Sequence, residues 1–452
     1  MGWSWAASPT AVGTSPVIAF ERQTITEDPM TTAEAEAEVY TFLEEDIQRA
    51  RDIVGIYHAV TQREQFSRIT PDVVRNFARS YGDDNPLFVD EDYGRDTRWG
   101  GQIAPPMFNI AVRQELKADR MPREHRRPPF RGIHVFVSGS STDWYRPVYD
   151  GDTIYSFHGF EKVELKESEF AGRSLLVTRV HVQFNQRAEV VQAQRVLTIH
   201  TERHESKKRK KYDAIEPASY TPEEIAAVDE IYAGEKPRGA EPRYWDDVQV
   251  GDSLDRMAKG PLTATDMMVF HSGGYGFAPY TPSASRLTYK NRQRIAPFYI
   301  PNEQGVPDVA QRIHWDSEYA RSIGLPAAYD YGMMRDCWLT HVLTDWMGDG
   351  GWIETMSSQI RKFNYLGDTH VFTGEVVGKR VEGDRHLIDI ELRGTSQRGE
   401  VTCPATATIS LPSRELDLAM LPAAPAEWER IAAQMLKRHG ELRAQARSAQ
   451  QA

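Results

Sequence analysis

Cysteine is nearly absent from this sequence: Cys337 and Cys403 are the only two among 452 residues. They form no Cys-x-x-Cys motif, so the sequence indicates neither a disulfide framework nor a zinc site built from cysteine pairs. Because disulfides belong mainly to oxidising compartments, a chain with so few thiols fits a reducing one, and we expect a cytoplasmic protein.

Long hydrophobic runs are also missing. No segment approaches the roughly 18 consecutive apolar residues of a membrane-spanning helix, so we expect no membrane partner. The opening segment, MGWSWAASPTAVGTSPVIAF, lacks the basic start of a signal peptide. Ala6 stands where a myristoylation signal has Ser or Thr. We expect residues 1–39 to be a disordered lead, with either Met1 or Met30 as the true start.

The chain has no excess of positive charge. Its formal net charge is −11, from 65 acidic and 54 basic residues, which gives no reason to expect a nucleic-acid partner. The composition, 40% apolar and 26% charged, is that of an ordinary globular protein. The basic run KKRKK (207–211) could contact a phosphate or serve in targeting. Charge runs are usually solvated, so we interpret it as part of a linker.

What the sequence does contain is an internal repeat. The segment GDDNPLFVDEDYGRD (82–96) aligns with QRIHWDSEYARSIG (311–324) at an offset of 226 positions. Asp90 then corresponds to Asp316. An aspartate that recurs in both copies suits a helix-capping or turn role better than catalysis.

The two copies differ at two positions where chemistry would occur. Phe88 corresponds to His314, and 18 residues further on Pro106 corresponds to Gly332. One copy therefore has a titratable imidazole and a backbone N–H, where the other has a phenyl ring and an imino acid. This pattern indicates a duplicated domain in which the second copy kept more of an active site.

The repeat continues along the chain in the same order. Its offset changes from 193 to 226, which places 33 extra residues (226−193) in the second half, between Tyr275 and His314. This insertion could line a pocket or be a plain surface excursion. The other aligned pairs are ITPDVVRNFARSYG (69–82) with LTATDMMVFHSGGY (262–275), YDGDT (149–153) with YLGDT (365–369), and NQRAEVV (185–191) with SQRGEVT (396–402).

Each half reads as a short helix, an acidic loop, a central helix and then strands. The first central helix is predicted to begin at Pro105-Pro106, because proline is favoured at a first helical position. The second is predicted to begin near Gly332. Apolar residues recur at helical spacing in both: Met107, Ile110 and Ala111 in the first, and Met334, Cys337, Trp338, His341 and Val342 in the second.

Segments rich in Val, Ile, Thr and aromatics follow each central helix. Because only short turns separate them, they predict an antiparallel sheet, and the fold class is α+β. The segments are HVFVSGS (134–140), TIYSFHGFEKVEL (153–165), SLLVTRVHVQF (174–184) and VVQAQRVLTIH (190–200) in the first half, and HVFTGEVVGKRV (370–381), HLIDIELRG (386–394) and TCPATATISL (402–411) in the second.

The repeat and the composition also predict the domain boundaries. A polar, proline-rich seam with a short helix from Pro222 separates the halves, and an amphipathic helix closes the chain after Pro425. The expected parts are a lead (1–39), a degenerate first domain (40–205), a linker (206–240), a second domain (241–413) and a helical tail (414–452).

The repeated motif resembles a known signature. GDDNPLFVDEDYGRD followed by IAPPM is similar to MaoC-like dehydratases, which resemble the R-specific enoyl-CoA hydratases. Their pattern is Gly-Asp-x-Asn-Pro-Leu-His-x-Asp, followed by a glycine that opens the central helix. The resemblance covers roughly residues 50–205 and 241–413. It implies two hot-dog domains, each an antiparallel sheet wrapped around one helix, and so a double hot dog.

Carried over residue by residue, the match is divided between the halves. The first half keeps Asp83 and Asn85 but has lost the histidine. The second half keeps His314 and Gly332, but Val309 occupies the position of the catalytic aspartate, and Asp308 lies one residue earlier.

From the resemblance we expect catalysis in the second half. His314 and Asp308 would form the acid–base pair, with Gly332 as a backbone donor. A rival version takes the carboxylate from Asp83 instead. The residues expected to contact substrate are Asp83, Asn85, Tyr331 and Met333.

The chemistry that the resemblance implies is the addition or removal of water across the 2,3 double bond of an enoyl-CoA. A His–Asp pair can activate water at neutral pH. A backbone N–H at a helix start can hold the enolate-like oxygen, and such a donor contributes about 3–4 kcal/mol. Pro106 has no N–H and a phenyl ring cannot shuttle protons, so the first half is not expected to form an independent site.

Two other functions remain open at this stage: a non-catalytic acyl-CoA-binding subunit and a hot-dog thioesterase. The sequence shows no metal cluster and no nucleotide motif, so we expect no metal and no cofactor beyond the CoA of the substrate. The resemblance places the chain in fatty-acid or steroid side-chain metabolism. Tandem domains can pair within one chain, and a further homodimer is left open.

Overall fold

The computed structural model describes residues 42–120, 125, 130, 134–168, 172–201, 215–275 and 285–451. The expected lead (1–39) and the KKRKK run (207–211) lie outside these residues, as does the first part of the insertion (276–284). Residues 40–452 form one compact unit. No described helix has the length and hydropathy needed to cross a lipid bilayer.

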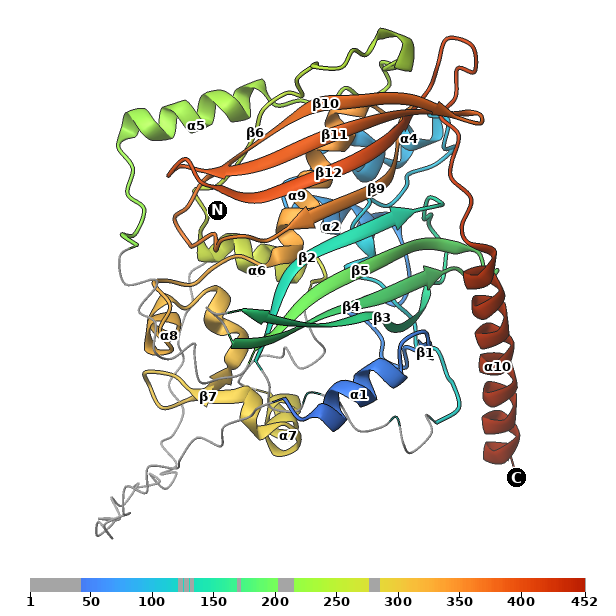
Figure 1. Cartoon of the computed structure of the whole chain (residues 1–452), viewed down its shortest axis with the longest axis vertical. Coiled ribbons are helices and arrows are strands. Elements are labelled where there is room, and N and C mark those ends of the chain that lie inside the picture. Colours follow the sequence, from blue (N-terminus) through green and yellow to red (C-terminus); the bar gives the residue numbers. More distant parts are fainter. Residues whose placement is uncertain are drawn as a thin grey trace, which may run out of the picture. The chain divides into compact units, whose positions relative to one another are not determined.

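The core of this unit is a ten-stranded sheet (Figure 1) in which all named strand pairs are antiparallel. The α+β class and the antiparallel arrangement are therefore confirmed. The strands are β1 (His58–Ala59), β2 (His134–Trp144), β3 (Tyr155–Ser168), β4 (Gly172–Phe184), β5 (Val190–Thr201), β6 (Met257–Lys259), β9 (Trp352–Gln359), β10 (His370–Glu382), β11 (Arg385–Ser396) and β12 (Val401–Leu411).

The strand order reflects the sequence repeat. It runs β1-β3-β4-β5-β2-β9-β12-β11-β10-β6, so the five strands of the second half repeat the first five in reverse about the β2–β9 junction. At that junction Ser140 pairs with Ser358. Because adjacent strands share backbone hydrogen bonds, the two halves form one continuous sheet.

Helix α9 (Gly332–Met347) is the central helix of the second half, and it begins where the sequence predicts. It packs against β9, β10 and β12. Thirteen of its 16 residues are buried, so tertiary packing rather than an exposed polar face stabilises it. It ends at Gly348, whose φ of +71° lies in the left-handed region that favours glycine.

Residues 105–120 of the first half, all of which the structure describes, form no equivalent helix, so the central helix predicted from Pro105-Pro106 is wrong. Only a three-residue 3-10 helix, η1 (Phe108–Ile110), forms there. The chain then hydrogen-bonds to distant segments instead of to itself: the N–H of Gln114 donates to Ile154 and the N–H of Leu116 to Val60. A backbone N–H used in this way cannot make an intrahelical bond.

Matching short helices precede the motif in both halves. α2 (Pro71–Ser80) and α6 (Ala264–Ser272) pack together, each capped by a threonine. The corresponding Phe77 and Phe270 are both fully buried. The motif itself forms α3 (Pro86–Val89) and α4 (Glu91–Arg95) in the first half, and η5 (Ala310–His314) and α8 (Ser317–Ser322) in the second.

The repeated aspartates have the structural roles that the sequence predicts. Asp90 caps α4 and Asp316 caps α8, each accepting backbone N–H groups of the first turn. The repeated Gly-Asp turns also recur, since Asp152 accepts the N–H of Tyr149 and Asp368 that of Tyr365.

The tail helix α10 (Ala426–Gln451) is present as expected and packs on the first half. Trp428 and Ala432 lie in a buried cluster with Val182 and Phe184 of β4. The other elements are α1 (Glu44–Asp52), α5 (Pro222–Gly234), η3 (Trp245–Asp247) and, in the insertion, α7 (Arg286–Arg294), η4 (Ala296–Phe298), β7 (Tyr299–Pro301) and β8 (Pro307–Val309).

Candidate functional site

His314, the last residue of η5, is held in a single tautomer. Its Nδ1 lies 2.9 Å from the carbonyl oxygen of Tyr329. Because a carbonyl can only accept, Nδ1 carries the proton and the neutral ring keeps its lone pair on Nε2. Burial lowers the pKa of His314 to about 4, although the hydrogen bond to Tyr329 acts in the opposite direction. The ring is therefore neutral at pH 7.

Tyr331 connects His314 to the start of α9. The rings of His314 and Tyr331 lie 3.8 Å apart between centroids, tilted by 32°. Tyr331 is the N-cap residue of α9, and Gly332 is the first residue of that helix. The Tyr331 hydroxyl also forms a hydrogen bond with Nε2 of His271. The expected contact residue Tyr331 thus contacts one of the residues predicted to carry catalysis and directly precedes the other in the chain.

Gly332 packs against the side chain of Ile360, which follows β9. A Cβ atom at position 332 would meet Cδ1, the flexible end of that side chain, so Ile360 would have to move. Since the first N–H groups of a helix have no intrahelical partner, the N–H of Gly332 points out of the start of α9. This end of the helix is also where its dipole favours negative charge.

A buried ion pair fixes the chain just before α9. Arg335 donates to both carboxylate oxygens of Asp330, each at 2.7 Å, and both side chains are buried. Asn364 donates to the same carboxylate at 2.9 Å, and Arg335 also donates to the carbonyl of Lys362. These contacts hold the 329–331 segment, and with it Tyr331, against the connection between β9 and β10.

Asp308 is not brought to His314. It lies in the small β7–β8 hairpin, where its carboxylate accepts the N–H of Val309 at 2.7 Å. Among the described residues, no hydrogen bond or ion pair joins Asp308 to His314. Asp308 instead lines a separate cavity of about 850 Å³ that also contacts Asp316. The pairing of Asp308 with His314 stays a prediction without a contact to support it.

Two more of the expected contact residues, Asn85 and Met333, have structural partners. Asn85 caps α3, and its side chain accepts the N–H of Leu87 at 3.0 Å. It lines a largely apolar cavity with Phe88 and Pro106, the first-half counterparts of His314 and Gly332. The sulfur of Met333, the second residue of α9, lies 3.7 Å from Nε2 of Gln194 in the first half.

A cavity of about 840 Å³ adjoins the start of α9. One wall contains Ile360, which packs on Gly332, and Phe363, whose ring lies 4.8 Å from that of Tyr329. The lining also includes the exposed side chains of Arg361, Lys362, Arg398, Glu216 and Glu400.

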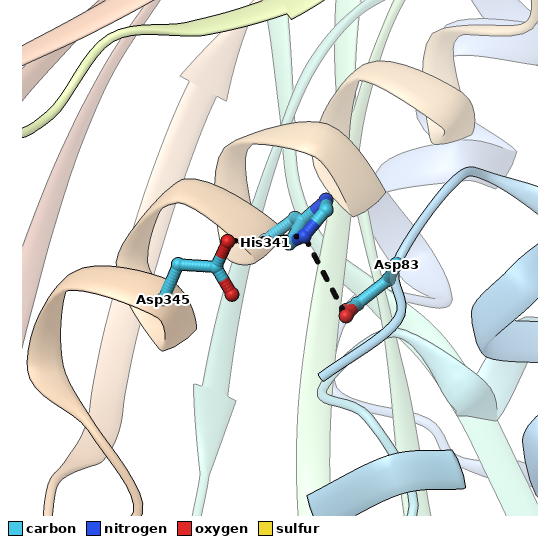
Figure 2. A group of neighbouring side chains, drawn as sticks. All are labelled: Asp83, His341 and Asp345. Carbon is cyan, nitrogen blue, oxygen red and sulfur yellow. Dashed lines mark ion pairs between the residues drawn. The ribbon is translucent and has the colours of Figure 1, made fainter. Parts of the chain in front are cut away.

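Asp83, the rival carboxylate, faces a different histidine. Figure 2 shows it pointing from the first-half motif toward His341 on α9, with Asp345 on the next turn. His341 Nε2 lies 3.5 Å from Asp83 Oδ1 and 3.3 Å from Asp345 Oδ2. On its other side, His341 Nδ1 lies 3.1 Å from Nζ of Lys259. We call Asp83, Lys259, His341 and Asp345 the junction cluster.

Burial dominates the electrostatics of the junction cluster. It raises the pKa of Asp83 and lowers that of Lys259. It lowers the pKa of His341 to about 4 and raises that of Asp345 to about 7. Each shift favours the neutral form of the group, as expected for charges removed from water. The cluster lies against a cavity of about 670 Å³.

The junction cluster resembles a cation site in spacing alone. Single ligand atoms of Asp83, His341 and Asp345 lie within 4.8 Å of one another. However, the Lys259 amine lies against Nδ1, and when it donates there the proton of the ring is on Nε2. A protonated Nε2 cannot bind a metal, so we assign no metal to the cluster.

The surroundings of His341 differ from those that its spacing predicts. The spacing makes it a member of an apolar stripe, and it is buried as expected, but among ionisable groups. The signal available was its spacing of four residues from Asp345, which puts both side chains on one helix face. Its partners Asp83 and Lys259 come from distant segments, which no spacing along the chain could indicate.

Comparisons with known proteins agree with the motif. Residues 59–194 match the family model described as FAS1-like, dehydratase domain region. A comparison with curated proteins gave no match.

Three solved structures illustrate the structural likeness. A MaoC-like dehydratase is 16% identical, with a TM-score of 0.54, over 80% of this chain and 99% of that chain. A MaoC domain dehydratase from Chloroflexus aurantiacus J-10-fl is 12% identical, with a TM-score of 0.48, over 80% and 96%. A double hot-dog protein from Mycobacterium tuberculosis is 12% identical, with a TM-score of 0.45, over 78% and 95%.

The first of these likenesses concerns the fold, and it spans nearly the whole of the chain it matches. The family match covers the first half, where the motif has lost its histidine. Together with the two sheet halves around one junction, they confirm the resemblance to MaoC-like hot-dog proteins, and the fold of the chain is a double hot dog.

Proposed function

We propose that this chain is a hydro-lyase that adds water to, or removes it from, the 2,3 double bond of an enoyl-CoA thioester, at a site formed by His314 and Gly332. The observation that carries the proposal is the position of the His314 ring on Tyr331, directly before the first N–H of α9. A neutral base and a helix-end donor are the two groups that this reaction needs.

His314 serves as both base and acid in the proposed step. Its Nε2 takes a proton from water, and the hydroxyl oxygen forms a bond to carbon 3 of the enoyl group. The electrons of the double bond move onto the thioester oxygen, which accepts the N–H of Gly332. The imidazolium then returns the proton to carbon 2, so one water is added and His314 is neutral again.

Room for the substrate would come from the cavity lined by Ile360, the side chain that packs on Gly332; His314 and Gly332 are not themselves among its lining residues. Its volume of about 840 Å³ lies within the range of small-molecule sites. At its exposed rim Lys362 pairs with Glu400 and Arg398 with Asp368, which leaves Arg361 as the lining cation without a carboxylate partner among the described residues. Since CoA carries phosphates, Arg361 supports a CoA thioester as the substrate. The acyl group stays open, and a panel of thioesters would define it.

A hydration assay on 2-enoyl-CoA thioesters with short, branched and bulky acyl groups tests the proposal. We expect His314→Ala to lower kcat by about 10²–10⁴, the usual contribution of a general base. Loss of enoyl absorbance reports hydration, whereas release of free thiol would report a thioesterase.

Two variants serve as controls. Phe88→Leu changes the same motif position in the first half and should leave turnover unchanged. Asp308→Asn tests the predicted pairing with His314: among the described residues its carboxylate bonds only to the N–H of Val309, so we expect kcat to change by less than about threefold, and a larger loss would support the pairing. Full activity of His314→Ala, with the fold retained by circular dichroism, would disprove the proposed site. Tight acyl-CoA binding without turnover on any member would favour the non-catalytic alternative.

A further inference from the structure

Lys259 is buried in an unusual way. Its side chain is at the end of β6, and the residue is only 6% exposed. Nζ lies 3.1 Å from His341 Nδ1 and 3.4 Å from the carbonyl oxygen of Gly82. No carboxylate oxygen of a described residue lies within 4.0 Å of it. Lysine is almost never fully buried unless an acid pairs with it, so a structural ion pair does not explain this residue.

The surroundings favour an uncharged amine. Burial lowers the pKa of Lys259, while the charges of Glu235, Asp83, Asp345 and Asp84 act in the opposite direction. His341, whose pKa burial lowers to about 4, is neutral at pH 7, and its Nδ1 lies 3.1 Å from the amine. Its Nε2 lies 3.5 Å from Asp83 and 3.3 Å from Asp345, so a proton can pass between the amine and these carboxyl groups through the ring. A neutral lysine amine is a nucleophile, and desolvation is one of the ways in which proteins activate it.

The amine lies at the wall of a cavity that could hold a small organic molecule. This cavity, which we call the junction cavity, has a volume of about 670 Å³, within the range of ligand sites. One side is apolar, from Leu262, Met334 and Trp338. The other is formed by the junction cluster. A ligand with a polar carbonyl end and a short apolar chain fits this division.

From this arrangement we infer that Lys259 forms an imine with an aldehyde or ketone bound in the junction cavity, with His341 and Asp345 moving the protons. The site shares no residue with the His314–Gly332 site, so the inference does not rest on the proposed hydration function.

The step balances without another reactant. The amine lone pair attacks the carbonyl carbon, a C–N bond forms, and a proton moves from nitrogen to oxygen. Asp345, as the carboxylic acid, then protonates the hydroxyl group, which leaves as water. The product is a protonated imine beside the Asp345 carboxylate. Because the imine withdraws electrons, the neighbouring C–H bond becomes acidic, and the reaction class is proton transfer at that carbon.

Reductive trapping tests the inference directly. The wild-type chain is incubated at pH 7 with butanone and sodium cyanoborohydride, and the modified lysines are mapped by peptide mass spectrometry. Exposed Lys236 lines the same cavity and is the internal control. We expect Lys259 to react faster than Lys236, since a lowered pKa raises the neutral fraction of the Lys259 amine at pH 7.

Variants then separate the two sites. Lys259→Arg should abolish the butanone adduct, His341→Gln should slow its formation, and Lys236→Arg and His314→Ala should leave it unchanged. The inference is overturned if Lys259 stays unmodified while exposed lysines react, or if it reacts no faster than Lys236. Because the mapping uses the wild-type chain, the result stands even if Lys259→Arg fails to fold.

Discussion

At the scale of single residues, one of the two differences between the motif copies is a backbone N–H. Gly332 begins α9, and its counterpart Pro106 lies before a 3-10 turn. Proline is sterically acceptable at a first helical position. The preceding Tyr331 has φ −85° and ψ 135°, the extended conformation that a residue before proline prefers. Position 332 can therefore accept a proline without a change of backbone.

This allows the N–H to be removed by itself. Gly332→Pro should lower kcat by about 10²–10³, the usual loss of an oxyanion donor. Gly332→Ala adds a Cβ against the flexible end of Ile360 but keeps the N–H, so it should lower kcat much less. Both variants would be measured in the enoyl-CoA assay, in an Ile360→Val background that makes room for the Cβ. Equal losses in the two variants would show that the N–H has no role.

The sequence predicts the residues of one site better than their partners. His314 and Gly332 could be found because the repeat compares each with a residue that lacks its chemistry. Asp308 was proposed from proximity in the sequence, and the insertion before it places it in a separate hairpin. His341 meets Asp83 only because the two halves share a sheet, and such a contact leaves no pattern in the sequence.

At the scale of elements, buried polar contacts as well as apolar packing hold α9 against the sheet. The Arg335–Asp330 pair fixes its first turn. Asp336, one residue later, accepts the hydroxyls of Ser140 on β2 and Ser358 on β9, each at 2.6 Å. The helix is thereby attached to the strands on both sides of the junction. The position of Gly332 depends on these contacts as much as on apolar packing.

Breaking the pair at the start of α9 should therefore be costly. Arg335→Met leaves the Asp330 carboxylate buried with fewer donors, and we expect a loss of about 3–5 kcal/mol in the free energy of unfolding. Urea denaturation followed by circular dichroism would measure it. The control is Arg393→Met, which removes an exposed ion pair with Glu391 and should have little effect. A similar small loss for Arg335→Met would contradict the proposed role of the pair.

The strands were easier to predict than the helices. Seven strand segments follow from their content of β-branched and aromatic residues, and each lies within or overlaps an observed strand. The prediction of a first central helix is wrong although Met107, Ile110 and Ala111 have helical spacing. The residues that follow them hydrogen-bond to distant segments, and Leu116 joins the buried cluster that α10 covers. Spacing alone cannot show that a helix from the far end of the chain covers this half.

At the scale of the whole molecule, two degenerate copies make one sheet with a buried polar centre. The order of strands about the β2–β9 junction follows from the repeat. The repeat does not indicate how many ionisable side chains are buried between the two copies. His200 and His370 are buried in the two halves. Partly buried histidines on β1, β3 and β4 form a row, in which His58 lies opposite His158 and His158 opposite His181.

These histidines predict how stability depends on pH. Burial lowers the pKa of six of them from the ordinary 6.5 to about 4 or about 3: His158, His181, His200, His314, His341 and His370. Between pH 6.5 and about 4 the unfolded chain therefore binds more protons than the folded one. The folded state should lose stability as the pH falls through this window. Carboxyl groups act in the opposite direction: burial raises the pKa of Asp345 to about 7, and it also raises the pKa of Asp83, Glu64, Glu235, Asp336, Asp349 and Glu354. We expect the histidines to outweigh them between pH 7.5 and 5.5, because the ordinary histidine pKa of 6.5 lies inside that interval.

Urea denaturation at pH 7.5 and 5.5 measures this effect. Each such histidine should contribute about 1 kcal/mol to the difference, because its unfolded form is largely protonated at pH 5.5 and its folded form is not. His158→Gln removes the middle residue of the row and should shrink the pH dependence by about that amount. A free energy of unfolding that stays constant or rises toward pH 5.5 would mean that buried carboxyl groups, rather than histidines, control the acid response of the double hot dog.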